Sequence, residues 1–212
     1  PTYHTPSTEQ IAPPGSSEGK RMERPQRDMP NDEELVRRAA VGDREAFAVL
    51  FDRYAPRVYR TALRITGDAA EADDATQEVF LRLHDQLHRF EERSSFSTWI
   101  YRVTVNLAID RTRTRARRPG SIDGVDAQAP DTATAPAERG DLERAVIAAL
   151  SGLSEKLRTA LVLRYLEDLS YEEIADVLEC SIGTVKSRLA RAHEEAGPAL
   201  QAVQNRVDAG EL

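Results

Sequence analysis

The sequence predicts an all-α protein with two small helical domains joined by a flexible linker, the second domain ending in a helix-turn-helix. Apolar residues recur at three- and four-residue steps through most of the chain, and no segment shows the period-two alternation of a half-buried strand. Two stretches rich in proline, glycine and small polar residues interrupt this pattern. The 212 residues suffice for one large domain or two small ones, and the interruptions favour two.

Five segments follow from these interruptions. Residues 1–30 hold six of the eleven prolines and too little apolar area to offset chain entropy, so we expect them to be disordered. A first helical domain is expected at 31–118 and a second at 139–200, each near the lower size limit for independent folding. The acidic segment 119–138 is the expected linker, and 201–212 is the expected C-terminal tail.

Helical stripes of apolar residues predict the elements of both domains. Gly67-Asp68 marks the end of one helix and the start of the next, because glycine favours helix C-termini and aspartate favours N-termini. The stripes run over Phe47–Val58, Val79–Leu87 and Trp99–Leu107 in the first domain, and over Leu142–Leu153 and Leu157–Leu166 in the second.

The strongest local pattern is a helix-turn-helix over 170–189. Ser170 and Glu173 form a capping box that begins the first helix. Ser181 is placed to cap the second helix through the amide of Gly183 or Thr184. Val185 and Leu189 lie four residues apart and should pack the second helix against the first.

The charges of this pair of helices predict DNA binding. The first helix carries four acids and no base, whereas the second carries three bases and no acid before Glu194. A helix-turn-helix places its second helix in the major groove, where arginine and lysine bind guanine edges and phosphates. An ordinary helix pair with a solvated basic face is the alternative. The candidate DNA contacts are Thr184, Lys186, Ser187, Arg188 and Arg191.

Charge in the first domain is segregated, although the whole chain has a net charge of −7. An acidic block lies between Asp68 and Glu78, and a basic block lies between Arg111 and Arg118. We interpret the blocks as two charged surfaces with different partners. Composition alone favours a simpler interpretation of the acidic helix as a solvated face whose acids suit the helix dipole.

A polar loop at 90–95 precedes a long helix that ends in arginines. Arg102, Asn106 and Arg113 lie at roughly helical spacing, so one side of this helix offers hydrogen-bond donors. Basic helix ends of this kind bind phosphates, but they are also common solubilising features. The aromatic residues Phe96, Trp99 and Tyr101 are expected in the core and not as base-stacking groups.

Several classes of function are not expected. No apolar run approaches the length of a membrane span, and the N-terminus lacks a secretory leader, so we expect a cytoplasmic protein that does not insert into membranes. Cys180, the single cysteine, fits a reducing compartment and a packing role, and a redox role is the alternative. His84 and His88 lack further ligands for a metal ion. Because no phosphate loop or catalytic constellation is present, neither a cofactor nor enzyme activity is expected.

Taken together, the two domains resemble a bacterial RNA polymerase sigma factor of the extracytoplasmic-function (ECF) group over about residues 31–200. The segment 74–80 is similar to the family's region 2.2, which binds core polymerase. The segment 96–106 is similar to regions 2.3–2.4, which read the promoter −10 element. The segments 169–175 and 183–188 are similar to region 4.2, the −35 helix-turn-helix.

The resemblance implies a role for each candidate residue. In the family's pattern, Asp74, Gln77 and Glu78 would contact the coiled-coil clamp of the polymerase β′ subunit. The −10 DNA-binding set would be Phe90, Arg102, Asn106 and Arg113, with Phe90 and Asn106 lining a pocket for a flipped base. The −35 set would be Thr184, Lys186, Ser187, Arg188 and Arg191. Some members carry arginine where this chain has Lys186, which suggests phosphate contact there.

The implied partners are core RNA polymerase, through its β′ clamp and β flap, and promoter DNA. An anti-sigma factor is a further partner that many members have. The linker would lie toward the RNA-exit path. Two other hypotheses stay open on the sequence: a stand-alone helix-turn-helix regulator that binds duplex DNA, and an enzyme that acts on nucleic acid.

Overall fold

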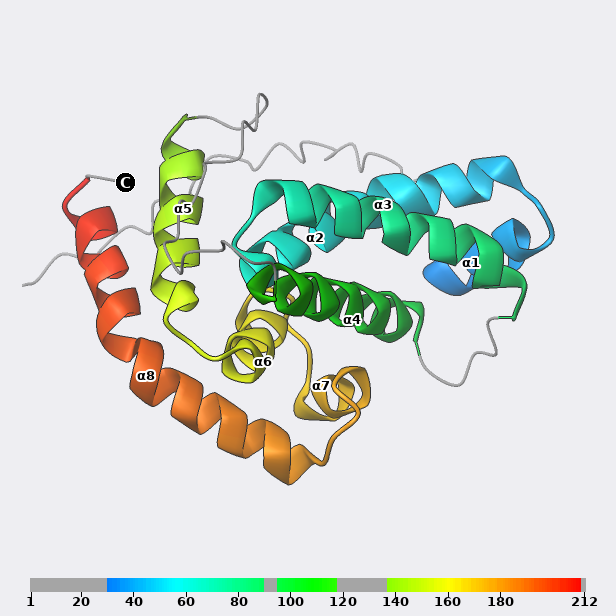
Figure 1. Cartoon of the computed structure of the whole chain (residues 1–212). Helices are drawn as coiled ribbons and strands as arrows, with labels where there is room; N and C mark the ends of the chain where they lie inside the picture. Colours follow the sequence, from blue (N-terminus) through cyan, green and yellow to red (C-terminus); the bar gives the residue numbers. More distant parts are fainter. Residues whose placement is uncertain (1–29, 90–94, 118–136, 211–212) are drawn as a thin grey trace, which may run out of the picture. The chain divides into compact units, whose positions relative to one another are not determined.

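The computed structural model describes residues 30–89, 95–117 and 137–210, and these residues form eight α-helices and one 3-10 turn with no strand (Figure 1). The predicted all-α fold class is confirmed. The N-terminal lobe contains α1 (Asp32–Ala40), α2 (Arg44–Thr66), α3 (Ala69–Gln86), η1 (Leu87–Arg89) and α4 (Phe96–Ala116). The C-terminal lobe contains α5 (Ala137–Ser151), α6 (Glu155–Tyr165), α7 (Tyr171–Val177) and α8 (Ile182–Asp208).

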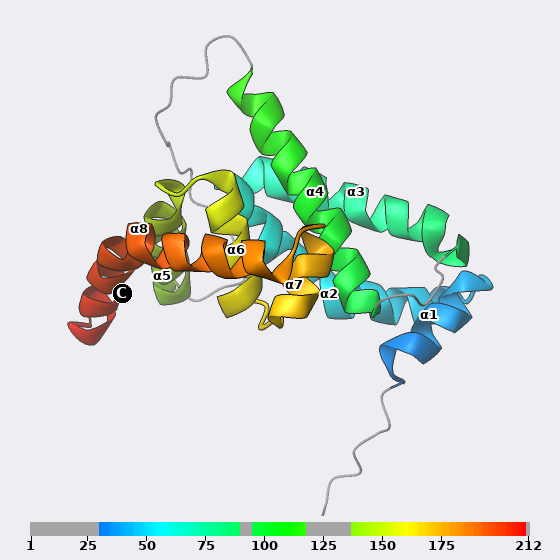
Figure 2. The ribbon, with the colours of Figure 1, turned by 90° about the horizontal axis from the view of Figure 1, so that it is seen from below.

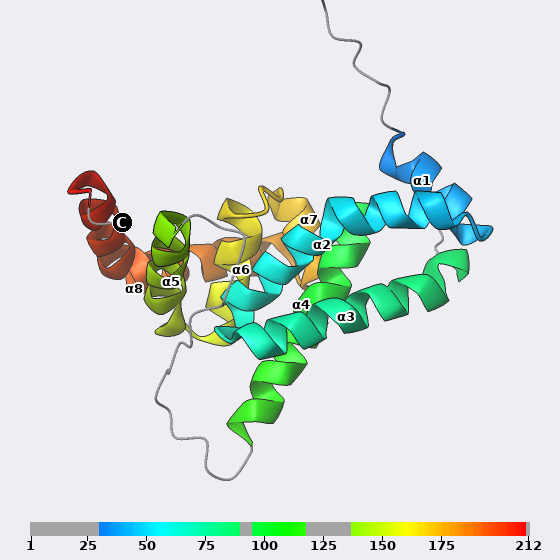
Figure 3. The ribbon, with the colours of Figure 1, turned by 90° about the horizontal axis from the view of Figure 1, so that it is seen from above.

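In the N-terminal lobe, α2 and α3 lie side by side and α4 packs across both (Figure 3). The stripe predicted on α2 supplies Leu50, Tyr54 and Val58, all buried. Gly67 adopts the left-handed conformation (φ 68°) that ends α2, and the Asp68 side chain accepts the Glu71 amide to begin α3. The predicted boundary between these helices is confirmed.

In the C-terminal lobe, α7 and α8 form the predicted helix-turn-helix. The capping box of Ser170 and Glu173 is complete, with each side chain bonded to the backbone N–H of the other residue. Ser181 Oγ accepts the amide of Thr184 at 3.1 Å and begins α8. Helix α8 continues through the segment 201–208 that the sequence assigns to a tail. It contains Pro198, and its ribbon bends along its length in Figure 1.

The two lobes pack against each other within one compact unit that begins at Asn31. One apolar cluster joins N-terminal core residues such as Val58 to C-terminal residues such as Leu163 and Ile174. A second cluster, which includes Leu150 and Ala192, belongs to the C-terminal lobe alone. Whether 31–118 and 139–200 fold independently stays a prediction. The expected N-terminal extension and linker lie outside the described residues, except for residue 30 and for 137–138, which begin α5.

Among the helices that the structure describes, none combines the length and the apolar character required to cross a bilayer.

Candidate nucleic-acid interface

The acidic residues predicted to bind polymerase lie on α3 and are paired within the lobe. Arg111, on α4, reaches three carboxylates, with nitrogen–oxygen distances of 3.3 Å to Glu71, 3.0 Å to Asp74 and 3.2 Å to Glu78. Arg82 also pairs with Glu78 at 2.6 Å. We call Glu71, Asp74 and Glu78 the acidic triad. Its members share one face because they lie at helical spacing.

Burial and charge act in opposite directions on Arg111. Burial by itself would lower the pKa of this guanidinium, but hydrogen bonds and charge from the acidic triad outweigh burial and raise the pKa. The Asp74 side chain stays 61% exposed while Arg111 is only 23% exposed, so Asp74 is the member of the triad most accessible to a partner. Gln77, on the same helix, is exposed.

The acidic and basic blocks of the sequence therefore meet in part, through two arginines of α4. Arg111 joins the triad, and Arg115 pairs with Asp68 at 2.8 Å. At these two arginines the expectation of separate surfaces was wrong, because α4 lies against α3, which brings the end of the basic helix beside the start of the acidic one. Segregation along the chain says nothing about such a pairing.

Three of the four predicted −10 residues lie on α4. Asn106 is exposed, and Arg102 is half-buried with its Nε atom lacking a hydrogen-bond partner in the described part of the chain. Arg113 donates two hydrogen bonds, of 3.2 and 2.9 Å, to the Glu155 carboxylate on α6. Phe90 lies outside the described residues.

The aromatic residues of α4 belong to the core, as predicted. Phe96 and Tyr101 are buried, and Trp99 is half-buried with its ring stacked near that of Phe96 at 6.2 Å between centroids. They hold the helix in place and leave its polar side to make contacts.

The predicted −35 residues lie on the first three turns of α8. Lys186, Ser187 and Arg191 are exposed. Neither Lys186 nor Arg191 has an ion pair among the described residues. Thr184 is half-buried and shares a 2.9 Å hydrogen bond with Ser181. Arg188 is also half-buried, and its Nη1 lies 3.8 Å from the Cys180 sulfur. Val185 and Leu189 are buried on the opposite side, as predicted.

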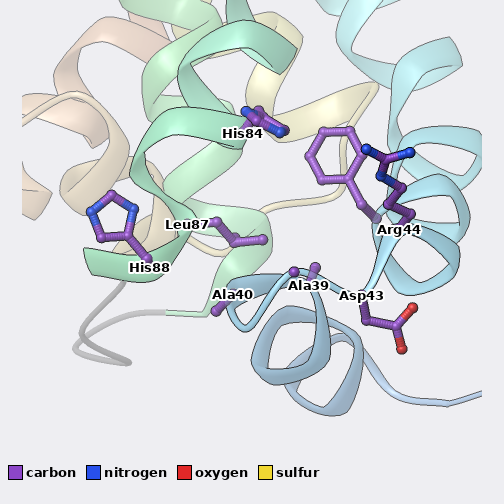
Figure 4. Close-up of a pocket in the computed structure, with 9 residues that line it drawn as sticks. Ala39, Ala40, Asp43, Arg44, His84, Leu87 and His88 are labelled. Carbon is purple, nitrogen blue, oxygen red and sulfur yellow. The ribbon is translucent and has the colours of Figure 1, made fainter.

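A pocket of about 450 Å³ lies between the α1–α2 turn and the end of α3 (Figure 4). His84 and His88 line it, and the His84 ring meets the edge of Phe47 at 5.7 Å between centroids. Over residues 30–89, 95–117 and 137–210, no group of three or more potential ligands could hold a metal ion. Arg44 is the pocket's exposed base.

Sequence reasoning missed a set of polar contacts between the lobes. Glu167, in the α6–α7 turn, accepts hydrogen bonds from Thr61 and Tyr101, and Arg158 donates to the carbonyl of Ile65. These partners are 106, 66 and 93 positions apart in the chain. No motif or spacing indicates a pair of that kind.

Burial and hydrogen bonding change two of these groups. Burial, reinforced by the hydrogen bond to Glu167, raises the pKa of the Tyr101 hydroxyl and keeps it protonated as a donor. Burial lowers the pKa of Arg158. Its guanidinium donates to four carbonyls, those of Ile65, Leu150, Ser151 and Leu153, at 2.8–3.1 Å. The last three lie at the end of α5, where the helix dipole favours a cation.

Comparison with known proteins matches both lobes to one family. Residues 50–118 match the family model of Sigma-70 region 2, and residues 143–194 match that of Sigma-70 region 4. The two matches contain all of the predicted polymerase- and DNA-binding residues, in the order that the sequence predicts.

Whole-chain relatives agree with these matches. The RNA polymerase sigma-H factor of Pseudomonas aeruginosa is 38% identical over 184 residues, which cover 80% of this chain and 94% of that protein. The ECF RNA polymerase sigma-E factor of Escherichia coli K12 is 36% identical over 174 residues, covering 77% and 91%. In the solved structure of CnrH in complex with the cytosolic domain of CnrY, a chain with 26% identity superposes with a TM-score of 0.63, covering 81% of this chain and 97% of that one.

The motifs predict two promoter-reading helices and a polymerase-binding face, the structure confirms the helix-turn-helix and the all-α fold, and the relatives span both lobes. The chain belongs to the extracytoplasmic-function group of RNA polymerase sigma factors, and it binds core RNA polymerase and promoter DNA to direct promoter recognition.

Proposed function

We propose that this sigma factor binds core polymerase through the acidic triad side of α3, reads the −10 element with α4 and reads the −35 element with α8. The observation that supports this assignment is exposure. Asp74, Asn106 and Lys186, one residue from each motif, have exposed side chains on helices whose opposite sides are buried. Each helix is therefore held by its core and free to contact a partner.

The polymerase contact involves Asp74, Gln77 and Glu78. Arg111 already pairs with two of these three residues, so a basic helix such as the β′ clamp would replace one set of ion pairs with another. Such an exchange favours specificity over raw affinity, because the carboxylates are never left without a counter-charge. The C-terminal lobe would contact the β flap.

The −10 contact involves Asn106 and Arg102, with Phe90 and Arg113 as further members of the set. The amide of Asn106 can both donate to and accept from the edge of a base that has left the duplex. Capture of such a base favours the melted promoter. Asn106→Ala should therefore impair promoter opening, measured by permanganate reactivity, more than it impairs initial binding to the duplex. Equal losses in the two steps would contradict this role.

The −35 contact involves the exposed side of α8. Lys186 and Arg191 are placed to bind phosphates, which positions the helix in the major groove. Arg188, with its planar guanidinium, suits a guanine edge. The half-buried contact of Arg188 with Cys180 would be exchanged for the base.

We propose that the protein catalyses no reaction itself, that RNA synthesis belongs to the core enzyme, and that it acts in the cytoplasm. An anti-sigma factor is a further proposed partner. It is supported by the likeness to CnrH, which was solved with the cytosolic domain of CnrY.

Run-off transcription with core polymerase on a promoter library tests the proposal. RNA that starts at defined positions only when the protein is present supports it, and no promoter-dependent RNA on any template contradicts it.

A pull-down with core polymerase separates a sigma factor from a stand-alone regulator. Glu78→Lys should weaken the complex by roughly 2–5 kcal/mol, because it places a cation against the basic partner and against Arg111. Glu172→Lys makes the same charge change at an exposed position of α7, outside the proposed α3 contact, and is the matched control. Equal retention of both variants would contradict the assignment of α3.

A further inference from the structure

We propose that the pocket between the α1–α2 turn and the end of α3 binds a small aromatic phosphate of about the size of a mononucleotide, and that the bound ligand competes with core polymerase. The binding itself does not depend on the proposed function. The competition rests on the proposed polymerase contact of α3, and it adds a second, smaller ligand to that face.

The pocket has the volume of a small-molecule site and firm walls. Its volume of about 450 Å³ falls within the range of roughly 300–1,000 Å³ that is usual for such sites. Figure 2 shows the α1–α2 turn beside the end of α3, and α1 contacts η1 there. Buried residues anchor each wall, among them Leu35 of α1, Ala46 of α2 and Leu83 of α3. A ligand therefore does not have to order these walls when it binds.

Asp43, the acidic residue of the lining, already has its charge satisfied. Its carboxylate pairs with Arg38 at 2.7 Å and accepts the backbone N–H groups of Glu45 and Ala46. Figure 4 shows this carboxylate turned away from His84. Because these bonds also cap the start of α2, an anion in the pocket has to bind through side chains and not through the first N–H groups of this helix.

Arg44 gives the pocket a positive charge. It is the first residue of α2, it is exposed, and it has no ion pair in the parts of the chain that the structure describes. His84 on α3 and His88 on η1 line the other side of the pocket (Figure 4). Asp85, beside His84 in the chain, is not part of the lining. Guanidinium and imidazole N–H groups are donors, and a phosphate has several acceptor oxygens for them.

Aromatic groups supply the second half of the site. The Phe47 ring meets the His84 ring edge-on, with 5.7 Å between centroids and an angle of 83° between the ring planes. Ala39 and Ala40 face the pocket with side chains too short to fill it. An aromatic ring in this space gains contacts with Phe47 and His84 that an inorganic phosphate cannot make. The lining therefore favours a ligand that carries both a ring and a phosphate.

The pocket continues the face of α3 that is proposed to bind core polymerase. Exposed residues recur along this face at four- and three-residue steps, at Gln77, Leu81, His84 and His88. Leu81 is 67% exposed and lies between the proposed contact and the pocket. At about 1.5 Å per residue, His84 is only about 10 Å along the helix from Gln77, which is about the width of one helix. A helical partner that covers Gln77 and Leu81 therefore reaches the pocket and excludes its ligand.

Nuclear magnetic resonance of the histidine rings tests the binding in the full chain, which has four histidines. His193 is the internal control, because it lies on α8 and pairs with Tyr165 of α6. The probes are adenosine monophosphate, inorganic phosphate and adenosine. We expect saturable shifts of the His84 and His88 signals with adenosine monophosphate. Inorganic phosphate should bind several-fold more weakly because it lacks the ring, and adenosine about tenfold more weakly because it lacks the charge.

Two variants separate the halves of the site. Arg44→Gln should weaken the binding of adenosine monophosphate about tenfold, because it removes a charge-assisted hydrogen bond. Phe47→Leu keeps an apolar side chain and removes the ring, so it should weaken binding several-fold. Arg60→Gln, at an exposed base of α2 outside the pocket, is the matched control, and thermal unfolding checks that each variant is folded. Equal affinity in Arg44→Gln and Arg60→Gln, or His193 shifts as large as those of His84, would overturn the site.

Titration of core polymerase with and without saturating adenosine monophosphate tests the competition. Linkage requires the nucleotide to lower the affinity for core polymerase by the same factor as core polymerase lowers the affinity for the nucleotide. We expect a several-fold loss in the parent and a smaller loss in Arg44→Gln at the same nucleotide concentration. An affinity for core polymerase that the nucleotide leaves unchanged would overturn the competition.

The two measurements also keep this site apart from the proposed function. Histidine shifts in a protein that does not bind core polymerase would retain the site and overturn the proposed function. Binding to core polymerase without any histidine shift would do the reverse.

Discussion

The two proposed binding faces of this sigma factor differ in how their charges are satisfied. On the N-terminal lobe, Arg111 pairs with the acidic triad and Arg113 pairs with Glu155. On α8, Lys186 and Arg191 are exposed and have no ion pair within the described part of the chain. The N-terminal lobe must therefore exchange ion pairs when it binds, whereas α8 presents charges that only water and counterions cover.

This difference suggests different roles in promoter recognition. Unpaired bases on α8 give DNA binding that is fast and depends strongly on salt, because phosphates displace counterions and no competing carboxylate has to leave. Paired charges on α3 and α4 give contacts that form only with a partner able to replace the internal ones. We therefore expect the proposed −35 helix to bind without rearrangement, and the proposed polymerase and −10 faces to bind only when a partner replaces their internal ion pairs.

The largest effect expected on this comparison is that of Arg188→Ala, which should weaken binding to a cognate −35 duplex by about 1–3 kcal/mol and relax specificity at one base. Fluorescence anisotropy measures the affinity for the cognate duplex and for duplexes with one base pair changed, and a salt series gives the salt dependence. Lys186→Ala is the matched variant for a phosphate contact. It should weaken binding to all sequences and lower the salt slope by about one. Unchanged cognate affinity in Arg188→Ala would show that this arginine reads no base.

A smaller effect is expected from Arg111→Gln. Without Arg111, the acidic triad carries an uncompensated negative field, so core polymerase should bind faster and more tightly at low salt. The same repulsion should lower the free energy of unfolding by roughly 0.5–1 kcal/mol. Surface plasmon resonance and thermal unfolding measure the two changes. Arg82→Gln, which removes only the pair with Glu78, is the control and should have a lesser effect on both.

If Arg111→Gln weakened core binding, the arginine would be a positioning residue for the triad and not a competitor for it. That outcome would mean that the face on α3 and the face on α8 do not differ in whether internal ion pairs must be replaced on binding.

The smallest expected effect is a change in how the stability of the N-terminal lobe depends on pH, and it concerns the carboxylate of Asp43. Backbone N–H groups, led by that of Ala46, and the Arg38 guanidinium lower the pKa of Asp43 below its ordinary value of 3.8. A carboxyl whose pKa is lowered on folding stabilises the fold above its unfolded pKa, and that stabilisation is lost as pH falls through the folded pKa. The loss from this residue is therefore expected below about pH 4.

Asp43→Asn keeps a side chain that can cap α2 but removes the titration. Thermal unfolding between pH 7 and pH 3 should show a smaller loss of stability on acidification in Asp43→Asn than in the parent. A loss as large in the variant would mean that other carboxylates account for acid sensitivity. Asp52→Asn, an exposed acid in the middle of α2, serves as the control.

Local chemistry explains which features could be predicted from the sequence. The capping box of Ser170 and Glu173, the cap at Ser181 and the Gly67-Asp68 boundary each involve residues within a few positions of one another. The buried sides of α2 and α8 follow from helical periodicity, which places Val58 or Leu189 in the core whatever the partner helix is. Fold class, helix-turn-helix and family resemblance all depend on such short-range patterns.

The pairings across the molecule were decided only by the tertiary structure. Arg111 meets the acidic triad because α4 lies against α3, and Glu167 meets Thr61 and Tyr101 because the lobes close on each other. An ion pair or hydrogen bond depends on where two distant segments come together in space. Sequence by itself determined which side chains could bind a partner, and the packing of the helices decided which of them bind each other in the free protein.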